Sequence, residues 1–535
     1  MRIGLAQINS TVGGFEENFE KIRGYIDQAK RRKLNIIVFP ELALCGYPPQ
    51  DLLFKRSFLK ANLFYLNKLK KHLKGELLAI VGYASQKKGR LFNSLAVLSK
   101  DKIIDIYSKI HLPNYGVFGQ KRYFTASQEA KLYLYKNFKI ILTICEDIWR
   151  EDLLKFLHKK ANPQILINSS ASPFFAGKFE IRKKYFASLA RKFNLTILYC
   201  NLVGGQDELI FDGSSIVVDS QGRIILKAER FKEDLLIFDS QAKYQPLQTK
   251  IDKIEEIYQA LILGIKDYLE KNNFKKAIVG VSGGIDSALT LFLAQKAIGR
   301  ENVLALIMPS RFSSSETFND AVSFVQKLGV KFHIIPIESI YSSYLDTVKP
   351  YLKDQNYKKD VTFQNIQARI RGNILMAFSN YFGYLVLNTG NKSEVSVGYC
   401  TLYGDTVGGF GVLKDVYKTE VYKLARFINR KIKKNIIPSS IIRRAPSAEL
   451  KPNQKDEDDL PPYSLLDKIL KLYIEEDKSL KEIISLGYKK NIVEKIVKSV
   501  EKSEYKRRQA PPGIKITPKA FGKDRHIPIT NKFSP

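Results

Sequence analysis

Short apolar runs alternate with amphipathic stretches along roughly the first 240 residues of the chain. Eight of these runs have the length and β-branched content of buried strands: residues 3–7, 36–39, 77–82, 94–98, 140–144, 165–168, 196–200 and 215–218. Helical stretches lie between several of them, including residues 18–30 and 178–193. Such runs are typical of strands buried on at least one face. The pattern predicts an α/β domain over residues 1–240.

A polar stretch over residues 241–250 separates this part from a second unit, and we interpret it as a linker. The second unit, residues 251–535, shows an alternation of predicted helices and strands at residues 251–271, 276–281, 303–308, 315–328 and 332–336. This βαβ succession predicts a doubly wound parallel sheet of the Rossmann-like kind. From about residue 438 the chain is rich in charge and proline, and we expect this extension to cover the second site as a lid.

The composition is typical of a soluble globular protein, with 44% hydrophobic and 26% charged residues among 535. The sequence contains no apolar run long enough to cross a membrane and begins directly with a strand pattern, so we expect a cytoplasmic protein without membrane contact. Four widely spaced cysteines and five dispersed histidines argue against a disulfide framework and a zinc site. We therefore expect each cysteine to be a small buried residue by default.

The net charge of +33 is unusual. The lysines are scattered through helical segments rather than gathered in one tail, which favours compositional bias and phosphate-bearing substrates over nucleic acid. We expect no nucleic-acid partner. A basic nucleic-acid-binding protein on an enzyme-like scaffold stays open as an alternative, and the salt dependence of any RNA or DNA affinity distinguishes the two.

Three strand ends in the first domain carry residues with complementary chemistry. Glu41 follows the run IIVFP, Lys109 follows IIDIYS, and Cys145 follows IILTI. Residues that leave the same ends of neighbouring strands converge on one crevice, so the three are expected to meet. A cysteine attacks a carbonyl as thiolate, Glu41 can take the thiol proton, and Lys109 can stabilise an oxyanion. Each residue also has an ordinary structural explanation when taken alone.

Together with their flanks these sequences resemble the nitrilase superfamily, whose pattern is a glutamate after an apolar strand, then K-x-x-L-P, then C-E-D. The resemblance implies an αββα sandwich and an amidase with Glu41, Lys109 and Cys145 as catalytic residues. The stretches LPNYGVF and NLVGGQDELIFDGS resemble the glutaminase branch. That branch implies that glutamine is held by Tyr115, Glu146, Ser172 and Lys178.

The sequence departs from this family at one point. The family usually carries Asp-Glu after NYGVF, whereas Gly119 and Gln120 stand here. We expect this difference to alter the geometry of the loop and to leave the three catalytic residues as they are.

The phrase KKAIVGVSGGIDSAL is the most specific in the second domain. An apolar strand leads into Ser282, Gly283 and Gly284, and a helix begins near Asp286. Glycines let a backbone approach an anion closely, and a helix N-terminus presents free N–H groups to it. The phrase lacks the lysine of a Walker loop and resembles the PP-loop of ATP pyrophosphatases, which transfer AMP to an acceptor oxygen. Asp286 can hold Mg²⁺ against the phosphates.

Other PP-loop enzymes include GMP synthetase, asparagine synthetase and tRNA-thiolating enzymes. A thiolating enzyme needs reactive cysteines in this half, where only Cys400 is present, and asparagine synthetase has an N-terminal cysteine where this chain has Arg2. An acceptor other than a dinucleotide carboxylate stays open from the residues alone.

Later phrases, including QNIQARIRG, NTGNKSE, KDVYKTEVYKLAR and KRRQAPPGIKIT, resemble the glutamine-dependent NAD synthetases over essentially the whole chain. The resemblance implies glutamine, ATP and deamido-NAD as substrates, Mg²⁺ as cofactor and a homo-oligomer. The implied ATP contacts are Gly280, Val281, Ser282, Gly283, Gly284, Ile285, Asp286, Ser287 and Thr389. The implied deamido-NAD contacts are Asn365, Arg369, Glu394, Lys418 and Lys506. Asp286 and Glu394 are the implied Mg²⁺ ligands.

Overall fold

The computed structural model describes residues 1–352, 361–451 and 454–533, and the contacts divide the chain into two compact units, Met1–Ile251 and Asp252–Pro535. Within the described ranges, none of the helices combines the length with the apolar character that spanning a bilayer requires.

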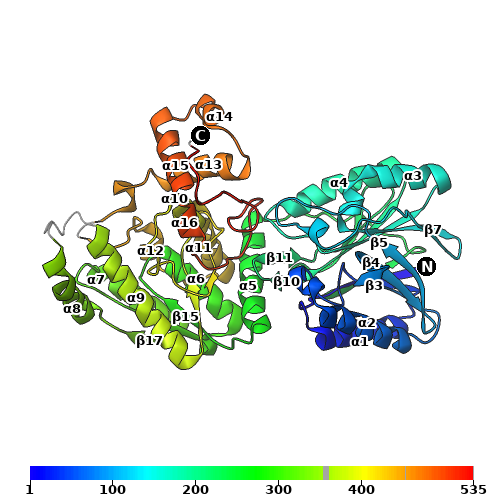
Figure 1. The fold of residues 1–535 in the computed structure, drawn as a ribbon, viewed down its shortest axis with the longest axis horizontal. Coiled ribbons are helices and arrows are strands. Elements are labelled where there is room, and N and C mark those ends of the chain that lie inside the picture. Colours follow the sequence, from blue (N-terminus) through cyan, green and yellow to red (C-terminus); the bar gives the residue numbers. More distant parts are fainter. Residues whose placement is uncertain (353–360, 452–453, 534–535) are drawn as a thin grey trace. The chain divides into compact units, whose positions relative to one another are not determined.

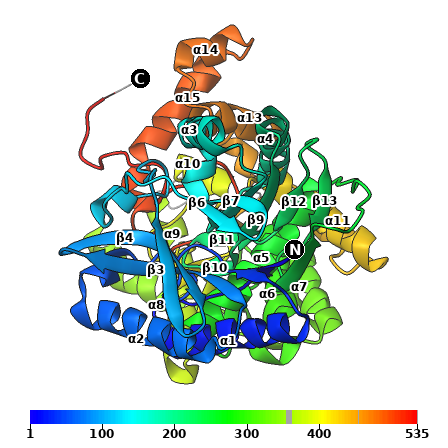
Figure 2. The same ribbon diagram turned by 90° about the vertical axis from the view of Figure 1, so that its right-hand side faces the viewer.

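The N-terminal unit contains two six-stranded sheets between two layers of helices (Figures 1 and 2). The first sheet has the order β14 (Asp234–Asp239), β1 (Arg2–Gln7), β2 (Ile36–Val38), β3 (Leu78–Lys87), β4 (Arg90–Ser99) and β5 (Lys102–Ser108). The second has the order β13 (Ile224–Lys227), β12 (Ile216–Val218), β9 (Thr196–Asn201), β8 (Ile165–Ser170), β7 (Phe138–Ile144) and β6 (Leu132–Tyr135). A separate hairpin pairs β10 (Val203–Gln206) with β11 (Leu209–Asp212). This architecture is the αββα sandwich that the sequence predicted.

Successive residues of the central strands serve two different cores. Ile3, Leu5, Ile36 and Val38 belong to the core between the sheets, whereas Ile37 packs into the core beneath the helices of the first sheet. Side chains alternate between the two faces of a strand, so a strand covered on both faces must be apolar at nearly every position. This double burial explains the continuous apolar runs in the sequence.

Helices cover the outer face of each sheet. The first sheet packs against α1 (Phe15–Arg31) and α2 (Arg56–His72), and the second packs against α3 (Glu151–Ala161) and α4 (Lys178–Phe193). Buried residues of α1 include Phe19, Ile22 and Ile26, at the three- and four-residue spacing of one helix face. The helix predicted at residues 178–193 has the bounds of α4.

The C-terminal unit contains a five-stranded sheet in which all neighbouring strands are parallel. Its order is β17 (Lys331–Ile334), β16 (Val303–Ile307), β15 (Ala277–Gly280), β18 (Leu385–Asn388) and β19 (Phe410–Gly411). The chain leaves β15 toward one edge and returns to its other side at β18. Ligands of open α/β sheets bind where the strand order reverses in this way. The predicted doubly wound sheet is confirmed, and its crevice lies at the ends of β15 and β18.

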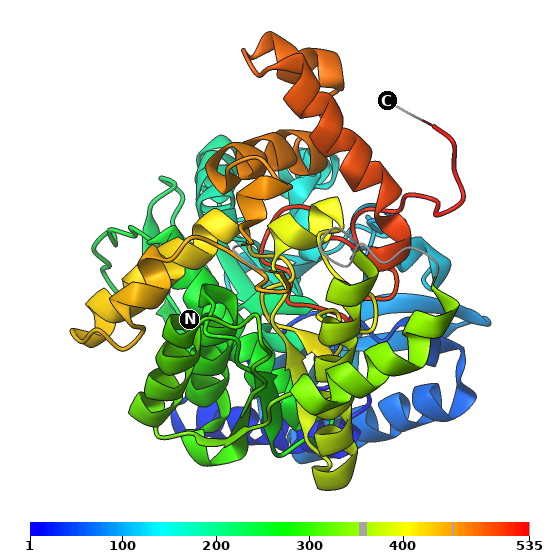
Figure 3. The ribbon, with the colours of Figure 1, turned by 90° about the vertical axis from the view of Figure 1, so that its left-hand side faces the viewer.

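Helices complete this unit (Figures 1 and 3). They include α5 (Lys253–Lys271), α6 (Ile285–Ile298), α7 (Ser315–Leu328), α9 (Val361–Phe382), α10 (Lys392–Val397), α11 (Lys418–Ile432), α13 (Tyr463–Leu470) and α15 (Lys490–Lys502). Helix α9 packs on the sheet face that carries Ile278 and Val386, whereas α5, α6 and α11 pack against one another.

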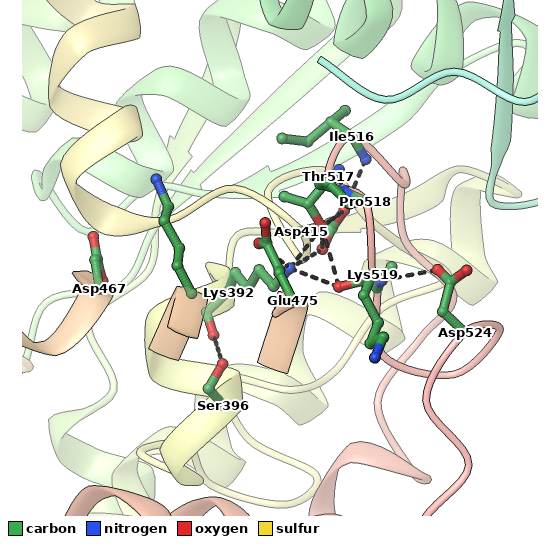
Figure 4. Close-up of polar contacts among 12 residues, drawn as sticks. Lys392, Ser396, Asp415, Asp467, Glu475, Ile516, Thr517, Pro518, Lys519 and Asp524 are labelled. Carbon is green, nitrogen blue, oxygen red and sulfur yellow. Dashed lines mark hydrogen bonds and ion pairs between the residues drawn. The ribbon is translucent and has the colours of Figure 1, made fainter. Parts of the chain in front are cut away.

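A buried ionic cluster anchors the C-terminal segment to α10 (Figure 4). The side chain of Lys392 is fully buried, and its Nζ lies 2.9 Å from Asp415 and 3.1 Å from Glu475. The same ammonium donates to Thr517 Oγ1 at 2.6 Å and to the carbonyl oxygen of Lys519 at 2.9 Å. Burial lowers the pKa of Lys392, but the two carboxylates outweigh it and leave that pKa raised. The lysine therefore stays charged.

Replacing this lysine tests how strongly the cluster holds the unit. Lys392→Met leaves Asp415 and Glu475 buried without their cation, so we expect a loss of about 3–5 kcal/mol in the free energy of unfolding. The change should lower the denaturant midpoint of the far-UV circular dichroism signal. The fluorescence of Trp149, the single tryptophan, reports the N-terminal unit and should keep its midpoint.

The matched control is Lys431→Met, which removes an exposed ion pair with Glu255. Exposed pairs contribute about 1 kcal/mol or less. A shift for Lys392→Met no larger than that of the control would show that the cluster is not a stabilising anchor.

Candidate active sites

The structure brings together the three residues predicted at the strand ends of the N-terminal unit. Glu41 follows β2, Lys109 follows β5 and Cys145 follows β7, and all three are buried. The Nζ of Lys109 lies 2.7 Å from Glu41 Oε1, and both side chains are fully buried. Burial lowers the pKa of Lys109, but Glu41, Cys145 and Asp147 together outweigh it and leave that pKa raised. Lys109 therefore stays charged in the interior.

The carboxylate of Glu41 accepts hydrogen bonds from further donors. Asn93 Nδ2 donates to Oε1 at 2.6 Å, Gln120 Nε2 donates to Oε1 at 3.2 Å, and the backbone N–H of Ala171 donates to Oε2 at 3.1 Å. The Gly119–Gln120 departure from the family pattern therefore lies at the site itself, because Gln120 bonds directly to Glu41. Asn93 was missed because β4 gives no signal beyond an apolar strand.

Cys145 stands at a sharp turn between a strand and a helix. It follows β7, begins the 3-10 helix η3 (Cys145–Trp149) and has a φ of +43°, which L-residues rarely adopt. The pKa of the Cys145 thiol is raised to about 12, because burial and the charge of Glu41 outweigh the opposing charge of Lys109. The thiol is therefore protonated at neutral pH and depends on a base to become a nucleophile.

Asp147 fixes the turn at Cys145 and was not among the predicted site residues. Its carboxylate accepts the backbone N–H of Ile144 at 3.0 Å, the backbone N–H of His111 at 2.7 Å and the hydroxyl of Tyr107 at 2.8 Å. It thereby joins the end of β7 to the segment that follows Lys109. Asp147 is the aspartate of the C-E-D phrase, so the sequence motif already contained the residue that fixes this turn.

The residues predicted to hold glutamine lie around Glu41, Lys109 and Cys145. Tyr115 is partly exposed and donates its hydroxyl to Glu146, directly after the cysteine, at 2.8 Å. Ser172 follows Ala171 in the chain, and its N–H donates to Asn201. Lys178 donates to the carbonyl of Pro173 at 2.6 Å, and its charge lowers the pKa of the Cys145 thiol. These four side chains thus share one region.

The second predicted site is the turn after β15. Gly283 has a φ of +84°, and a Cβ there would lie 2.3 Å from the carbonyl oxygen of Thr317, so the backbone conformation and the packing both require glycine. Ser287 Oγ accepts the N–H of Ser282 at 3.2 Å and donates to the carbonyl of Gly284 at 2.9 Å. Helix α6 begins directly after Gly284 and directs its N-terminus at this turn.

A cavity of about 310 Å³ opens at this turn, at the reversal of strand order. Its lining includes all nine residues predicted for ATP, namely Gly280, Val281, Ser282, Gly283, Gly284, Ile285, Asp286, Ser287 and Thr389. Glu394 and Lys418 line it as well. Other lining residues were not predicted, among them Arg371, Asp405, Arg444, Glu449 and Asp456. Of these, Arg444 donates to the carbonyl of Gly283 at 3.2 Å.

Lys418 lies between the two carboxylates predicted to bind a metal. Its Nζ pairs with Asp286 and lies 3.0 Å from Glu394 Oε1. The pKa of Glu394 is raised to about 7, because burial, helped by the charge of Asp286, outweighs the lowering effect of Lys418. In the described part of the chain no three His, Cys, Asp or Glu residues are grouped to hold a metal. Two carboxylates do fit Mg²⁺, which is bound through one or two carboxylates together with substrate phosphates.

Three further predicted residues do not line the cavity and instead contact one neighbouring loop. Asn365 Oδ1 accepts the hydroxyl of Thr401 at 2.7 Å, and Arg369 donates to the carbonyl of Leu402 at 3.2 Å. Lys506 donates to the carbonyls of Gly398 and Cys400, each at 2.8 Å. Because Tyr399 and Thr401 in this loop line the cavity, the three residues lie in its second layer.

Comparisons with known proteins match a different family to each of the two units. The carbon-nitrogen hydrolase family model matches residues 2–248, and the NAD synthase family model matches residues 257–510. The chain is 42% identical, over all of its length and 99% of the relative, to a glutamine-dependent NAD(+) synthetase from Thermotoga maritima. It is 43% identical to one from Aquifex aeolicus, with both chains fully covered.

Solved structures are similar over the same length. A glutamine-dependent NAD+ synthetase from Acinetobacter baumannii in complex with ADP is 41% identical, with 99% of this chain and 98% of the other covered and a TM-score of 0.80. One from Cytophaga hutchinsonii, at 24% identity, has a TM-score of 0.86 over the same shares and shows the shared fold.

The protonated state of the Cys145 thiol has a measurable consequence. Well below the pKa of about 12, each unit of pH raises the thiolate fraction about tenfold. The rate at which iodoacetamide alkylates Cys145, followed by peptide mass spectrometry, should rise about tenfold per unit between pH 7 and pH 9. A rate that is flat below pH 8 would indicate a preformed thiolate paired with Lys109 and contradict this assignment.

Proposed function

The chain belongs to the glutamine-dependent NAD(+) synthetases, and from this premise we propose how its two sites divide the reaction. As a member of this family it is a ligase that hydrolyses glutamine and uses the ammonia to convert deamido-NAD to NAD at the expense of ATP. The products are NAD, AMP, pyrophosphate and glutamate. The proposal assigns hydrolysis to residues 1–240 and synthesis to residues 251–535, with residues 241–250 as the linker.

Hydrolysis uses Cys145 as nucleophile and Glu41 as base. The pKa of the thiol, raised to about 12, leaves it protonated, so its proton passes to Glu41 as the sulfur attacks the side-chain amide of glutamine. Lys109 stays charged and stabilises the oxyanion. Glu41 then returns the proton to the departing nitrogen, which leaves as ammonia, and next activates the water that cleaves the thioester. The observation that carries this assignment is the buried contact of Lys109 with Glu41 beside the cysteine.

Glutamine is held by Tyr115, Glu146, Ser172 and Lys178. Tyr115 and Glu146 are joined by a hydrogen bond next to the nucleophile, and Lys178 acts electrostatically on the same thiol. A carboxylate and an ammonium suit the amino and carboxylate groups of an amino acid, which carry the opposite charges. This match of opposite charges supports the assignment of the region as the glutamine pocket.

Synthesis takes place at the cavity beside Gly283. ATP binds with its phosphates on the turn over residues 280–287, where the N-terminus of α6 and the hydroxyls of Ser282 and Ser287 offer donors. The nicotinate carboxylate of deamido-NAD attacks the α-phosphate, which releases pyrophosphate and forms the adenylate. Ammonia then displaces AMP from that anhydride and gives the amide of NAD.

Asp286 and Glu394 hold Mg²⁺ in this proposal, and the ion neutralises phosphate charge when it is bound. Lys418 bonds to both carboxylates and keeps them close together. Asn365, Arg369 and Lys506, with Glu394 and Lys418, form the deamido-NAD side of the site. The common contact of Asn365, Arg369 and Lys506 with the loop over residues 398–402 supports a single subsite.

We also propose that the enzyme works in the cytoplasm as a homo-oligomer without nucleic-acid or membrane partners. The resemblance of the sequence to this family supports the proposed location and assembly.

Removing the nucleophile should separate the two activities. Cys145→Ala is expected to lower glutamine-driven NAD formation by about 10⁴-fold or more, because no thioester forms. Synthesis from added ammonium chloride should continue at the unmodified rate. Both rates of synthesis, with glutamine and with ammonium chloride, are measured by chromatography of the NAD and AMP formed. Cys200→Ala, which changes a buried thiol bonded to backbone carbonyls, is the matched control and should keep both activities. Loss of ammonia-driven synthesis in Cys145→Ala would refute the division.

Removing the carboxylate at the start of α6 should abolish synthesis from either nitrogen source. Asp286→Asn is expected to lower both rates by about 100-fold or more, because the developing phosphate charge loses its ion. ATP–pyrophosphate exchange that depends on deamido-NAD should fall in parallel, while glutamine hydrolysis persists. The exposed Asp346→Asn has the same charge change and should have no effect. Normal exchange in Asp286→Asn would rule out its role with Mg²⁺.

A further inference from the structure

Gln120 reaches the catalytic base from a distant part of the sequence. It begins the 3-10 helix η2 (Gln120–Arg122) and its side chain is buried, with a relative exposure of 5%. Its Nε2 lies 3.2 Å from Glu41 Oε1 and 3.2 Å from the hydroxyl oxygen of Tyr47. The carboxamide is therefore enclosed beside Glu41, although the neighbouring residues Gly119 and Lys121 are exposed.

The two oxygens of Glu41 have unequal surroundings. Oε1 accepts hydrogen bonds from Asn93, Lys109 and Gln120, whereas Oε2 accepts one from the backbone N–H of Ala171. A carboxylate oxygen has about two lone-pair directions, so three donors saturate Oε1. Oε2 keeps a free direction for a proton.

The orientation of the amides supports an ionised carboxylate. Gln120 Oε1 and Asn93 Oδ1 are both buried without a hydrogen-bond partner in the described structure. A buried acceptor without a partner is destabilising, and turning an amide over would place its oxygen against the carboxylate. Both side chains thus leave an acceptor unpaired and direct their N–H groups at Glu41. Such an arrangement favours the negatively charged form of the base.

We propose that Gln120 is a positioning residue for glutamine hydrolysis, which holds Glu41 through Oε1 and reserves Oε2 for the proton of Cys145. In that step the S–H bond breaks, an O–H bond forms on Oε2, and the sulfur electron pair forms the bond to the amide carbon of glutamine. This inference rests on the proposed role of Glu41 as base and names how that base is prepared.

Gln120→Glu tests the inference through a pH profile. The variant places a second carboxylate at Oε1, among the titratable groups that face Glu41, which are Lys109, Tyr47 and Cys145. Two carboxylates in contact share one proton, so the base becomes free only at higher pH. The acid limb of kcat/KM for glutamine hydrolysis should move upward by about one pH unit or more. A change that merely loosened packing would lower the rate without moving this limb.

A second variant covers the case in which Gln120→Glu folds poorly. Gln120→Met keeps the length and removes the donor, and it should lower kcat by about tenfold with little change in KM for glutamine. Gln128→Glu is the matched control, because Gln128 is exposed and the charge change is the same. The denaturant midpoint of Trp149 fluorescence checks that the N-terminal unit of each variant is folded.

The outcomes separate this inference from the proposed function. If Glu41→Gln abolishes glutamine hydrolysis while Gln120→Glu keeps the unmodified pH profile, the role of Gln120 is overturned and that of Glu41 stands. If Glu41→Gln hydrolyses glutamine normally, the base assignment fails and the inference fails with it. A full kcat for Gln120→Met would also contradict the inference.

Discussion

A carboxylate and an ammonium in contact inside the protein are the interaction on which the N-terminal site depends. Removing either charge from water is costly, and the cost is repaid only when the partner and further hydrogen bonds are in place. Glu41 meets this condition with Lys109, two side-chain amides and a backbone N–H. Because these donors come from separate strands and loops, the sandwich has to be assembled before Glu41 is held in place. The chemistry of the unit is thus a product of its complete fold.

The C-terminal unit also holds carboxylates with a buried lysine, but there one lysine contacts two of them. Asp286 and Glu394 share one lysine, which holds the two carboxylates together beside the turn at Gly283. Lys418 also belongs to the helix that packs on α6, which places the turn and the lysine in one rigid arrangement. In both units a buried lysine is in direct contact with the carboxylates of the site. The reacting groups are therefore ordered before substrate arrives.

Much of this organisation is predictable from sequence, and the reasons are physical. Strands such as β2 and β8 are buried on both faces and appear as apolar runs, and the turn at Gly283 needs a residue type that the sequence displays. The hairpin of β10 and β11 is less visible, because Gly204 and Gly205 have low strand propensity. The contact of Gln120 with Glu41 was not foreseen, because it joins residues 79 positions apart, which local patterns do not record.

The turn that opens α10 links the reaction centre to the end of the chain. Asn391 donates to Asp286, Lys392 binds the C-terminal segment, Ser393 donates to Asp467 and Glu394 pairs with Lys418. Four consecutive side chains are thus committed to four different elements. The smallest chain able to keep this synthetase centre in shape must extend at least through Lys519, far beyond the last strand of its sheet. Natural shortening of such a chain from its carboxyl end is accordingly constrained by ionic contacts.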